Sequence, residues 1–447
     1  MHGRHGGYRT GEHVLTSLGE GLGGRIRRGC RSGCAYWARR QVISAFATAV
    51  VLSAAACSAS AGNGAAAKPL PPPAQLTITP ANGAQHVRPG ARVQVTAAGG
   101  TLRTVVVRTA GGQVPGQLGG SGTTWRSRGN LDPSRSYTVT ATAANAASKT
   151  VTATSSFTTL KPKKTFRASI TEGRGQQYGV GMPVILTFSR PITRKAAVEK
   201  ALRLTTSKPV VGAWYWDGAR TLVFRPRVYW PARTRVTVDG QFSGLEGGRG
   251  VYGVRYLRQT FEIGPPLIVV ASTRTHYMKV YYQGRLFGRW PISTGRPGDD
   301  TANGTYVTID KGNPLYFTGP GYALWVPWAV RITWSGTYIH DAYWSVWAQG
   351  HLNVSHGCIN TSPAHAETYY KMEVPGDPVT VTGSPRPGTW ANGWTEWFLS
   401  WKQLLKGSAL HEAVVAGPHG SSFVRPASLP APRAVAPLLA PRPHNAA

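Results

Sequence analysis

Acidic side chains are scarce in this sequence of 447 residues. It has 18 Asp and Glu against 50 Lys and Arg, which gives a formal net charge of +32. Such a chain is attracted to polyanions such as nucleic acid, an anionic cell wall or a phospholipid surface. It has no helix-turn-helix or zinc-finger pattern, so we expect no nucleic-acid partner. A GC-rich genome that favours arginine is the alternative source of the charge.

Cysteine is also scarce. Three of the four cysteines, Cys30, Cys34 and Cys57, lie in the first 57 residues. This placement excludes a disulfide framework across the folded part of the chain. The fourth, Cys358, is left as an unpaired thiol, and an odd free cysteine in an exported protein indicates a reactive group.

The sequence lacks an apolar run long enough for a comfortable membrane span. Residues 42–57 are apolar and rich in alanine, and they follow an arginine-rich stretch. This order predicts a secretory leader over residues 1–57. The end of the run, AAAC, resembles a lipoprotein signal with lipid attached to Cys57, and simple cleavage after the alanines is the alternative. Residues 58–75 are rich in Ala, Gly, Ser and Pro and predict a stiff tether.

Only 15% of the residues are charged, while Gly, Thr, Val and Pro are abundant. This composition favours short strands and turns, and the length favours about three domains. Alternating runs separated by turns predict one immunoglobulin-like sandwich over 76–160 and another over 161–264. Neither has a Cys-Trp-Cys core. A third, mostly β domain is predicted over 265–383, with a short helix at 363–372.

Two segments follow the third domain. Residues 384–408 hold four tryptophans, and we expect this extension to pack on the third domain. Residues 409–447 are rich in Ala and Pro without periodicity, which predicts a disordered tail.

The segment SHGCIN at 355–360 carries the clearest chemistry, and His340 stands 14 residues before it. A thiol becomes a strong nucleophile as the thiolate, and a neighbouring imidazole can take its proton and stabilise the anion. Both His340 and His356 are candidates for this base of Cys358. The spacing alone does not choose between them.

The glycine of this segment has two readings. Gly357 lets a substrate carbonyl approach the backbone, so the amides of Gly357 and Cys358 are candidates for an oxyanion hole. A plain turn is the alternative. Ser355 and Asn360 are candidates for orienting hydrogen bonds or ordinary turn formers. A zinc site is a competing interpretation, but no recognised ligand spacing is present, so we expect no metal. Its possible ligands are His340, His351, His356 and Cys358.

Residues 340–360, HDAYWSVWAQGHLNVSHGCIN, resemble the signature of the L,D-transpeptidase (YkuD-type) catalytic domain. That signature is a His, about fourteen to seventeen residues, and then Ser/Thr-His-Gly-Cys-x-Asn. The domain order over 76–407 resembles the actinobacterial members. The resemblance implies a mainly β protein with two immunoglobulin-like sandwiches, a β-rich catalytic domain and a short Trp-rich C-terminal extension.

The resemblance also implies roles for single residues. Cys358 is the acylated nucleophile, His340 the general base, and the backbone carbonyl of Asp341 orients that base. Family members often carry Ser in place of Asp341. Residues 312–322 match a substrate-covering flap, which is short here. The remaining positions that match the motif or contact substrate are Tyr322, Ser335, Gly336, Trp344, Ser355, His356, Gly357 and Asn360.

The implied reaction is 3–3 cross-linking of peptidoglycan. Cys358 attacks the carbonyl between the third residue and the terminal D-Ala of a tetrapeptide stem, and the side-chain amine of a second stem attacks the thioester. No cofactor is implied, and carbapenems acylate the same sulfur. The alternatives are an L,D-carboxypeptidase with water as acceptor and a non-enzymatic wall-binding protein. The expected location is outside the cytoplasm, with stems and anionic wall polymers or the membrane surface as partners.

Overall fold

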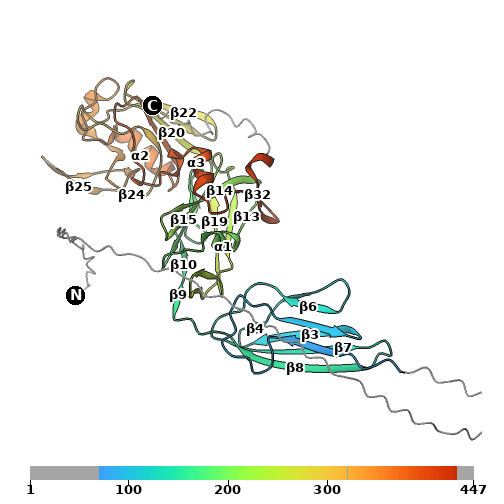
Figure 1. Cartoon of the computed structure of the whole chain (residues 1–447). Helices are drawn as coiled ribbons and strands as arrows, with labels where there is room; N and C mark the ends of the chain where they lie inside the picture. Colours follow the sequence, from blue (N-terminus) through green and yellow to red (C-terminus); the bar gives the residue numbers. More distant parts are fainter. Residues whose placement is uncertain (1–69, 320, 430–447) are drawn as a thin grey trace, which may run out of the picture. The chain divides into compact units, whose positions relative to one another are not determined.

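The computed structural model describes residues 70–319 and 321–429, and the chain is mainly β there (Figure 1). The predicted leader with Cys57, most of the tether, and residues 430–447 lie outside this range. No helix within the described residues is long and apolar enough to cross a membrane. The predicted mainly β fold is confirmed.

The first domain has two four-stranded sheets that share one hydrophobic core. Their strand orders are β1-β2-β6-β5 and β4-β3-β7-β8. Alternation along β7 explains the packing, because Tyr137 and Val139 are buried whereas Ser136 and Thr138 are exposed. The strands are β1 Gln75–Thr79, β2 Gln94–Ala98, β3 Thr101–Thr109, β4 Gly112–Gln113, β5 Gly116–Leu118, β6 Thr124–Ser127, β7 Ser136–Ala144 and β8 Thr150–Thr158.

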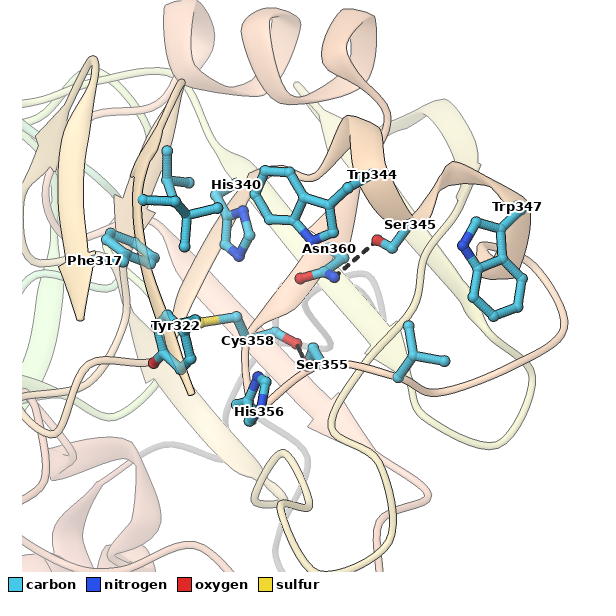
Figure 2. Close-up of a pocket in the computed structure, with 13 residues that line it drawn as sticks. Phe317, Tyr322, His340, Trp344, Ser345, Trp347, Ser355, His356, Cys358 and Asn360 are labelled. Carbon is cyan, nitrogen blue, oxygen red and sulfur yellow. Dashed lines mark hydrogen bonds between the residues drawn. The ribbon is translucent and has the colours of Figure 1, made fainter. Parts of the chain in front are cut away.

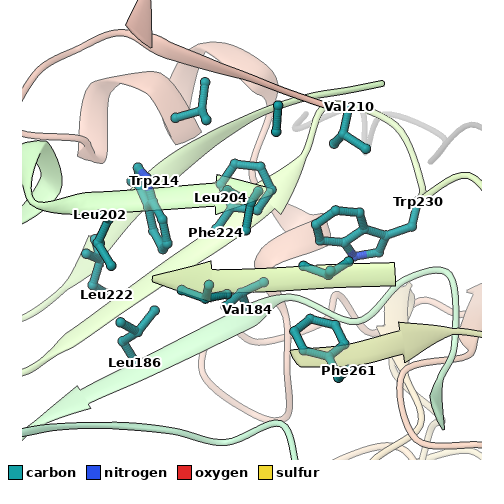
Figure 3. Packing of buried hydrophobic residues seen from close by; sticks show 14 of the residues in the cluster. Val184, Leu186, Leu202, Leu204, Val210, Trp214, Leu222, Phe224, Trp230 and Phe261 are labelled. Carbon is teal, nitrogen blue, oxygen red and sulfur yellow. The ribbon is translucent and has the colours of Figure 1, made fainter. Parts of the chain in front are cut away.

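The second domain packs its sheets around aromatic and branched side chains, among them Trp214, Phe224 and Phe261 (Figure 3). One sheet has the order β11-β19-β16-β13, and another begins β10-β12-β15-β14. A smaller sheet joins β17, β18 and β9. The elements are β9 Lys164–Phe166, β10 Ala168–Ile170, β11 Gln177–Tyr178, β12 Val184–Phe188, α1 Lys195–Lys200, β13 Leu202–Thr206, β14 Val210–Asp217, β15 Thr221–Pro226, β16 Arg235–Gly240, β17 Glu246–Gly248, β18 Val251–Gly253 and β19 Leu257–Ile263.

The third domain has a five-stranded sheet, β22-β21-β20-β30-β23, and a four-stranded sheet, β24-β27-β28-β29. Strands β28 and β29 are parallel, and their register sets His340 opposite Asn360. The hairpin β25–β26 lies in the segment predicted as a flap. The elements are β20 Leu267–Ser272, β21 Tyr277–Tyr282, β22 Arg285–Pro291, β23 Gly304–Val307, β24 Lys311–Gly312, β25 Leu315–Gly319, β26 Tyr322–Val326, β27 Ala329–Arg331, β28 Tyr338–Asp341, the 3-10 helix η1 Tyr343–Ala348, β29 Ile359–Thr361, α2 Pro363–Met372 and β30 Pro378–Thr382.

The C-terminal segment differs from its prediction at residues 409–429. Residues 409–429 are not disordered: β31 pairs with β14 and so extends a sheet of the second domain, and β32 pairs with β31. The Trp-rich extension packs on the third domain, where Phe398 lies 5.2 Å from Tyr306 and Trp394 lies 6.0 Å from Trp334 between ring centroids. It packs on the second domain as well, where Trp397 lies 4.5 Å from Tyr229. The elements are η2 Glu396–Phe398, α3 Trp401–Gly407, β31 Ala413–Gly417, β32 Gly420–Val424 and η3 Pro426–Ser428.

The buried carboxylate of Glu199 explains the order of this segment. It accepts hydrogen bonds from Trp216 Nε1, from Ser408 Oγ and from the amide of Ala409, each at 2.7 Å. Burial of a charged group is tolerated only when it is well bonded, so this carboxylate holds the chain that leads into β31. Ser408 and Ala409 lie more than 200 residues after Glu199 in sequence, which is why composition alone missed these contacts.

Candidate active site

The loop before β29 presents the thiol of Cys358. Gly357 has φ of +115°, a conformation that favours glycine and breaks the strand between His356 and Cys358. The Ser355 hydroxyl braces this turn: it accepts from the Gly357 amide at 3.1 Å and donates to the Cys358 carbonyl at 2.7 Å. The Gly357 amide therefore donates to Ser355 in this conformation, and its role in an oxyanion hole stays a prediction.

His340 lies at the end of β28 and is buried. Its Nδ1 is 2.6 Å from the backbone carbonyl of Asp341. A carbonyl only accepts hydrogen bonds, so Nδ1 carries the proton and Nε2 carries the free lone pair. Burial lowers the pKa of His340 to about 4, so the ring is neutral at neutral pH.

The thiol of Cys358 is a weak acid in this site. Burial raises the pKa of Cys358 to about 11, and its Sγ donates to the Gly336 carbonyl at 3.6 Å. A neutral thiol beside a neutral imidazole replaces the thiolate–imidazolium pair expected from the sequence. The physical reason is desolvation, which disfavours the charged form of each group. The proton must then move during attack on a substrate.

The carboxyl of Asp341 is a further buried group. Burial raises its pKa, and Oδ1 has no hydrogen-bond partner among the described residues. Its backbone carbonyl, rather than this carboxyl, is the group that bonds to His340. No group of three or more His, Cys, Asp or Glu in residues 70–319 and 321–429 is arranged to hold a metal ion.

A cavity of about 390 Å³ opens beside the sulfur (Figure 2). It joins the hairpin β25–β26, the end of β28, η1 and the loop of Cys358. The structure brings six of the predicted residues to it, namely Tyr322, His340, Trp344, Ser355, His356 and Asn360, together with Cys358. The lining residues that the sequence did not single out are Phe317, Leu324, Val326, Ser345, Trp347 and Val354.

A second cavity of about 230 Å³ lies on another side of the same loop. The predicted residues Ser335, Gly336 and Gly357 line it, and His356 lines both cavities. Arg386 and Asn392 of the C-terminal extension also line it, and no sequence motif singles them out. Cys358 lines the first cavity only; its link to the second is Gly336, which lines that cavity and whose carbonyl accepts from Sγ.

Ser345 is a positioning residue that sequence reasoning missed. Its hydroxyl accepts from Asn360 Nδ2 at 2.9 Å and donates to the Ala342 carbonyl at 3.2 Å. These bonds tie η1 to β29 below the cavity. A buried serine inside an otherwise aromatic segment, YWSVWA, is the only signal in the sequence that could have indicated this contact.

Comparisons with known proteins agree with this geometry. The family model described as the L,D-transpeptidase catalytic domain matches residues 266–381, and a bacterial Ig domain model matches residues 84–246. L,D-transpeptidase 5 of Mycobacterium tuberculosis is 38% identical over 76% of this chain and 78% of its own length. L,D-transpeptidase 2 of the same species is 35% identical over 75% of this chain and 85% of its own.

A solved structure of the L,D-transpeptidase LdtMt1 in complex with imipenem is 35% identical, with a TM-score of 0.43, and covers 49% of this chain and 100% of that one. A β-rich catalytic domain with a Cys–His site, preceded by an immunoglobulin-like region, defines a transpeptidase of the YkuD class. The chain belongs to the L,D-transpeptidase family, and it is an enzyme of that kind.

Proposed function

We propose that this chain forms 3–3 cross-links between peptidoglycan stems through a thioester on Cys358. The observation that carries the proposal is the sulfur of Cys358 in the lining of the first cavity, which His340 also lines with only its Nε2 free. A transpeptidase must admit two peptides to one sulfur, and we assign the second peptide to the second cavity, which Gly336 and Gly357 line next to Cys358.

In the first half-reaction, Sγ of Cys358 attacks the carbonyl carbon of the third stem residue and its proton passes to Nε2 of His340. The C–N bond to the terminal D-Ala breaks, and the leaving amine takes that proton from His340. A thioester and free D-Ala are the products. The Cys358 amide and the Tyr322 hydroxyl are the donors that we assign to the developing oxyanion.

In the second half-reaction, the side-chain amine of another stem attacks the thioester carbonyl. His340 takes a proton from that amine and returns it to the departing sulfur, which restores the starting thiol. Asp341 orients the base through its carbonyl, and Ser355 braces the loop. Gly336, Ser335 and Asn360 complete the substrate contacts that we assign.

The basic first domain supports a location at an anionic surface in the cell wall. Residues 70–160 contain a single acidic residue, Asp132, and their cationic side chains are all exposed. None of these cations forms an ion pair within the described residues, so their charge is available to anionic wall polymers or lipid headgroups. The cations are Arg88, Arg92, Arg103, Arg108, Arg126, Arg128, Arg135 and Lys149.

The test is to incubate the enzyme with a purified disaccharide tetrapeptide and to separate the products by mass. We expect free D-Ala and a dimer linked between two third residues, confirmed by fragmentation. Release of tripeptide without dimer would instead establish the carboxypeptidase, in which water resolves the thioester. Absence of any D-Ala release would overturn both activities and favour the non-enzymatic wall-binding alternative.

A further inference from the structure

Large hydrophobic side chains are unusually exposed on one side of the catalytic cavity. Five of the thirteen exposed large hydrophobic residues of the described chain lie within ten residues, 343–352. Two of them, Trp344 and Trp347, line the cavity, and Trp347 is 63% exposed. A cluster of exposed apolar groups at the rim of a pocket marks a binding surface. The other three are Tyr343, Val346 and Leu352.

This segment is held in place rather than loosely attached. The kink at Ser345 in η1 is fixed by the bond to Asn360, and Gln349 Nε2 donates to the Ala342 carbonyl at 3.4 Å. The amide of Gly350 donates to the Ile292 carbonyl. The polar side chains of the segment thus point inward and the aromatic rings outward, so the ring faces are arranged before any ligand arrives.

The two tryptophans that line the cavity, Trp344 and Trp347, differ in their contacts with other aromatic rings. Trp344 packs between His340, at 6.0 Å between centroids, and Tyr343, at 5.0 Å. Trp347 has no ring partner within the described residues, and Figure 2 shows it across the cavity from Tyr322. The chemistry proposed for Cys358 and His340 makes no use of Trp347.

We propose that Trp347, with Trp344 beside it, binds the amino-sugar chain that carries the donor stem. This inference rests on the proposed function. In peptidoglycan the stem begins on a sugar, and the carbonyl attacked by Cys358 belongs to the third residue. Three extended residues span about 10 Å. Ligand pockets typically have volumes of roughly 300–1,000 Å³, and this cavity of about 390 Å³ is near the lower limit. It therefore has room for the peptide, and the sugar lies at its rim.

The chemistry of the rim fits a sugar better than a lipid or a second protein. The C–H face of a pyranose ring is apolar and slightly positive, and it packs on the negative face of an indole while its hydroxyls stay in water. A membrane-binding segment would carry Lys or Arg beside its aromatic residues, whereas residues 342–354 carry none. Continuity with the catalytic cavity assigns the rim to the substrate.

The experiment compares two donor substrates, the free tetrapeptide and the disaccharide tetrapeptide, by release of D-Ala. The quantity compared is kcat/KM for the disaccharide tetrapeptide divided by kcat/KM for the free tetrapeptide. We expect Trp347→Ala to lower this ratio by roughly three- to tenfold. Trp347→Phe keeps most of the ratio because a ring face remains. Trp325→Ala is the matched control: Trp325 is also 63% exposed, but it is outside the lining of the cavity.

A binding measurement keeps this inference separate from the cross-linking proposal. In the Cys358→Ala protein, the disaccharide N-acetylglucosaminyl-N-acetylmuramic acid without peptide should shift the indole NMR signal of Trp347. That signal and its response should vanish in the double variant with Trp347→Ala. A parent enzyme inactive on both substrates would reject cross-linking, and the NMR arm would still decide the sugar site.

Two results would overturn the sugar site. The first is an unchanged substrate ratio in Trp347→Ala together with no indole shift. The second is binding to phosphatidylglycerol vesicles that depends on Trp347, with no response to the disaccharide, which would reassign the surface to a membrane.

Discussion

Nδ1 of His340 lies 2.6 Å from the carbonyl oxygen of Asp341, and this single bond determines which ring nitrogen can act as a base. Because Nδ1 is committed as a donor, Nε2 is left to face the cavity that also holds Cys358. That carbonyl belongs to the backbone, so any residue at position 341 can supply it. The Asp341 side chain is therefore free to differ among enzymes without loss of the orienting contact.

The nucleophile is tested by a carbapenem adduct. We expect the parent protein to gain the mass of one drug molecule and Cys358→Ala to gain none, since Cys358 is the sole cysteine among the described residues. Intact-protein mass spectrometry gives the answer directly. An adduct that persists in Cys358→Ala would locate the reactive group elsewhere.

The base is tested by a pair of histidine variants. His340→Ala should slow acylation by on the order of 10²–10⁴-fold, the usual contribution of a positioned proton acceptor. His356→Ala should cost less, because His356 is exposed and its ring contacts Tyr322 at 4.9 Å between centroids. Stopped-flow acylation with a carbapenem measures both. The assignment fails if only the His356 variant loses acylation.

The pH dependence distinguishes a neutral thiol–imidazole pair from a preformed ion pair. The lowered pKa of His340, about 4, means that its base form is lost only as pH falls toward 4. The raised pKa of Cys358, about 11, means that the thiol does not ionise near neutrality. The acylation rate constant should rise from pH 4 to about pH 6 and stay flat to pH 8.

The control for that profile is the same measurement in the presence of high salt, which should change it little because His340 is buried and Cys358 is partly buried. A rate that falls between pH 7 and pH 9 would indicate that an imidazolium is needed. That result would restore the thiolate–imidazolium pair.

The buried acid Glu172 should make the second domain sensitive to alkaline pH. Burial raises the pKa of Glu172 to about 8, so the folded state holds a proton that the unfolded state releases above about 4.5. Stability is therefore lost as pH rises from 4.5 to 8. Glu172→Gln, which needs no proton, should raise the Tm at pH 9 and change it little at pH 4.

The C-terminal segment should stabilise the second domain. Trp397 is buried, its Nε1 donates to the Gly181 carbonyl at 2.7 Å, and the Arg225 guanidinium lies 4.5 Å from its ring centroid. Trp397→Ala should lower the free energy of unfolding by about 3–5 kcal/mol. Exposed Trp325→Ala should stay within about 0.5 kcal/mol of the parent. Equal unfolding midpoints in urea for the two variants would contradict this role.

Lipid attachment at Cys57 stays a prediction, since that residue lies outside the described part of the chain. The mature protein isolated from membranes should begin at Cys57 and carry the added mass of a diacylglycerol group. A Cys57→Ala variant is the control and should be recovered from the soluble fraction. A mature N-terminus elsewhere without lipid would establish plain secretion.

From the amino-acid sequence alone we could predict the mainly β fold and propose Cys358 and His340 as the reacting pair. Alternating Val and Thr runs identify strands because each strand exposes one face, as Tyr137 and Thr138 show. The SHGCIN segment and the spaced His340 predict the chemistry because a cysteine and a histidine can supply a nucleophile and its base.

The neutral state of this pair and the position of residues 409–429 follow from contacts that exist only in the folded chain. Burial is a property of everything packed around a group, so the neutral state of Cys358 and His340 could not be read from their neighbours in sequence. The pairing of β31 with β14 and the bonds of Ser408 to Glu199 join residues about 200 positions apart. Local composition carries no information about such contacts, and for that reason an ordered segment was predicted as disordered.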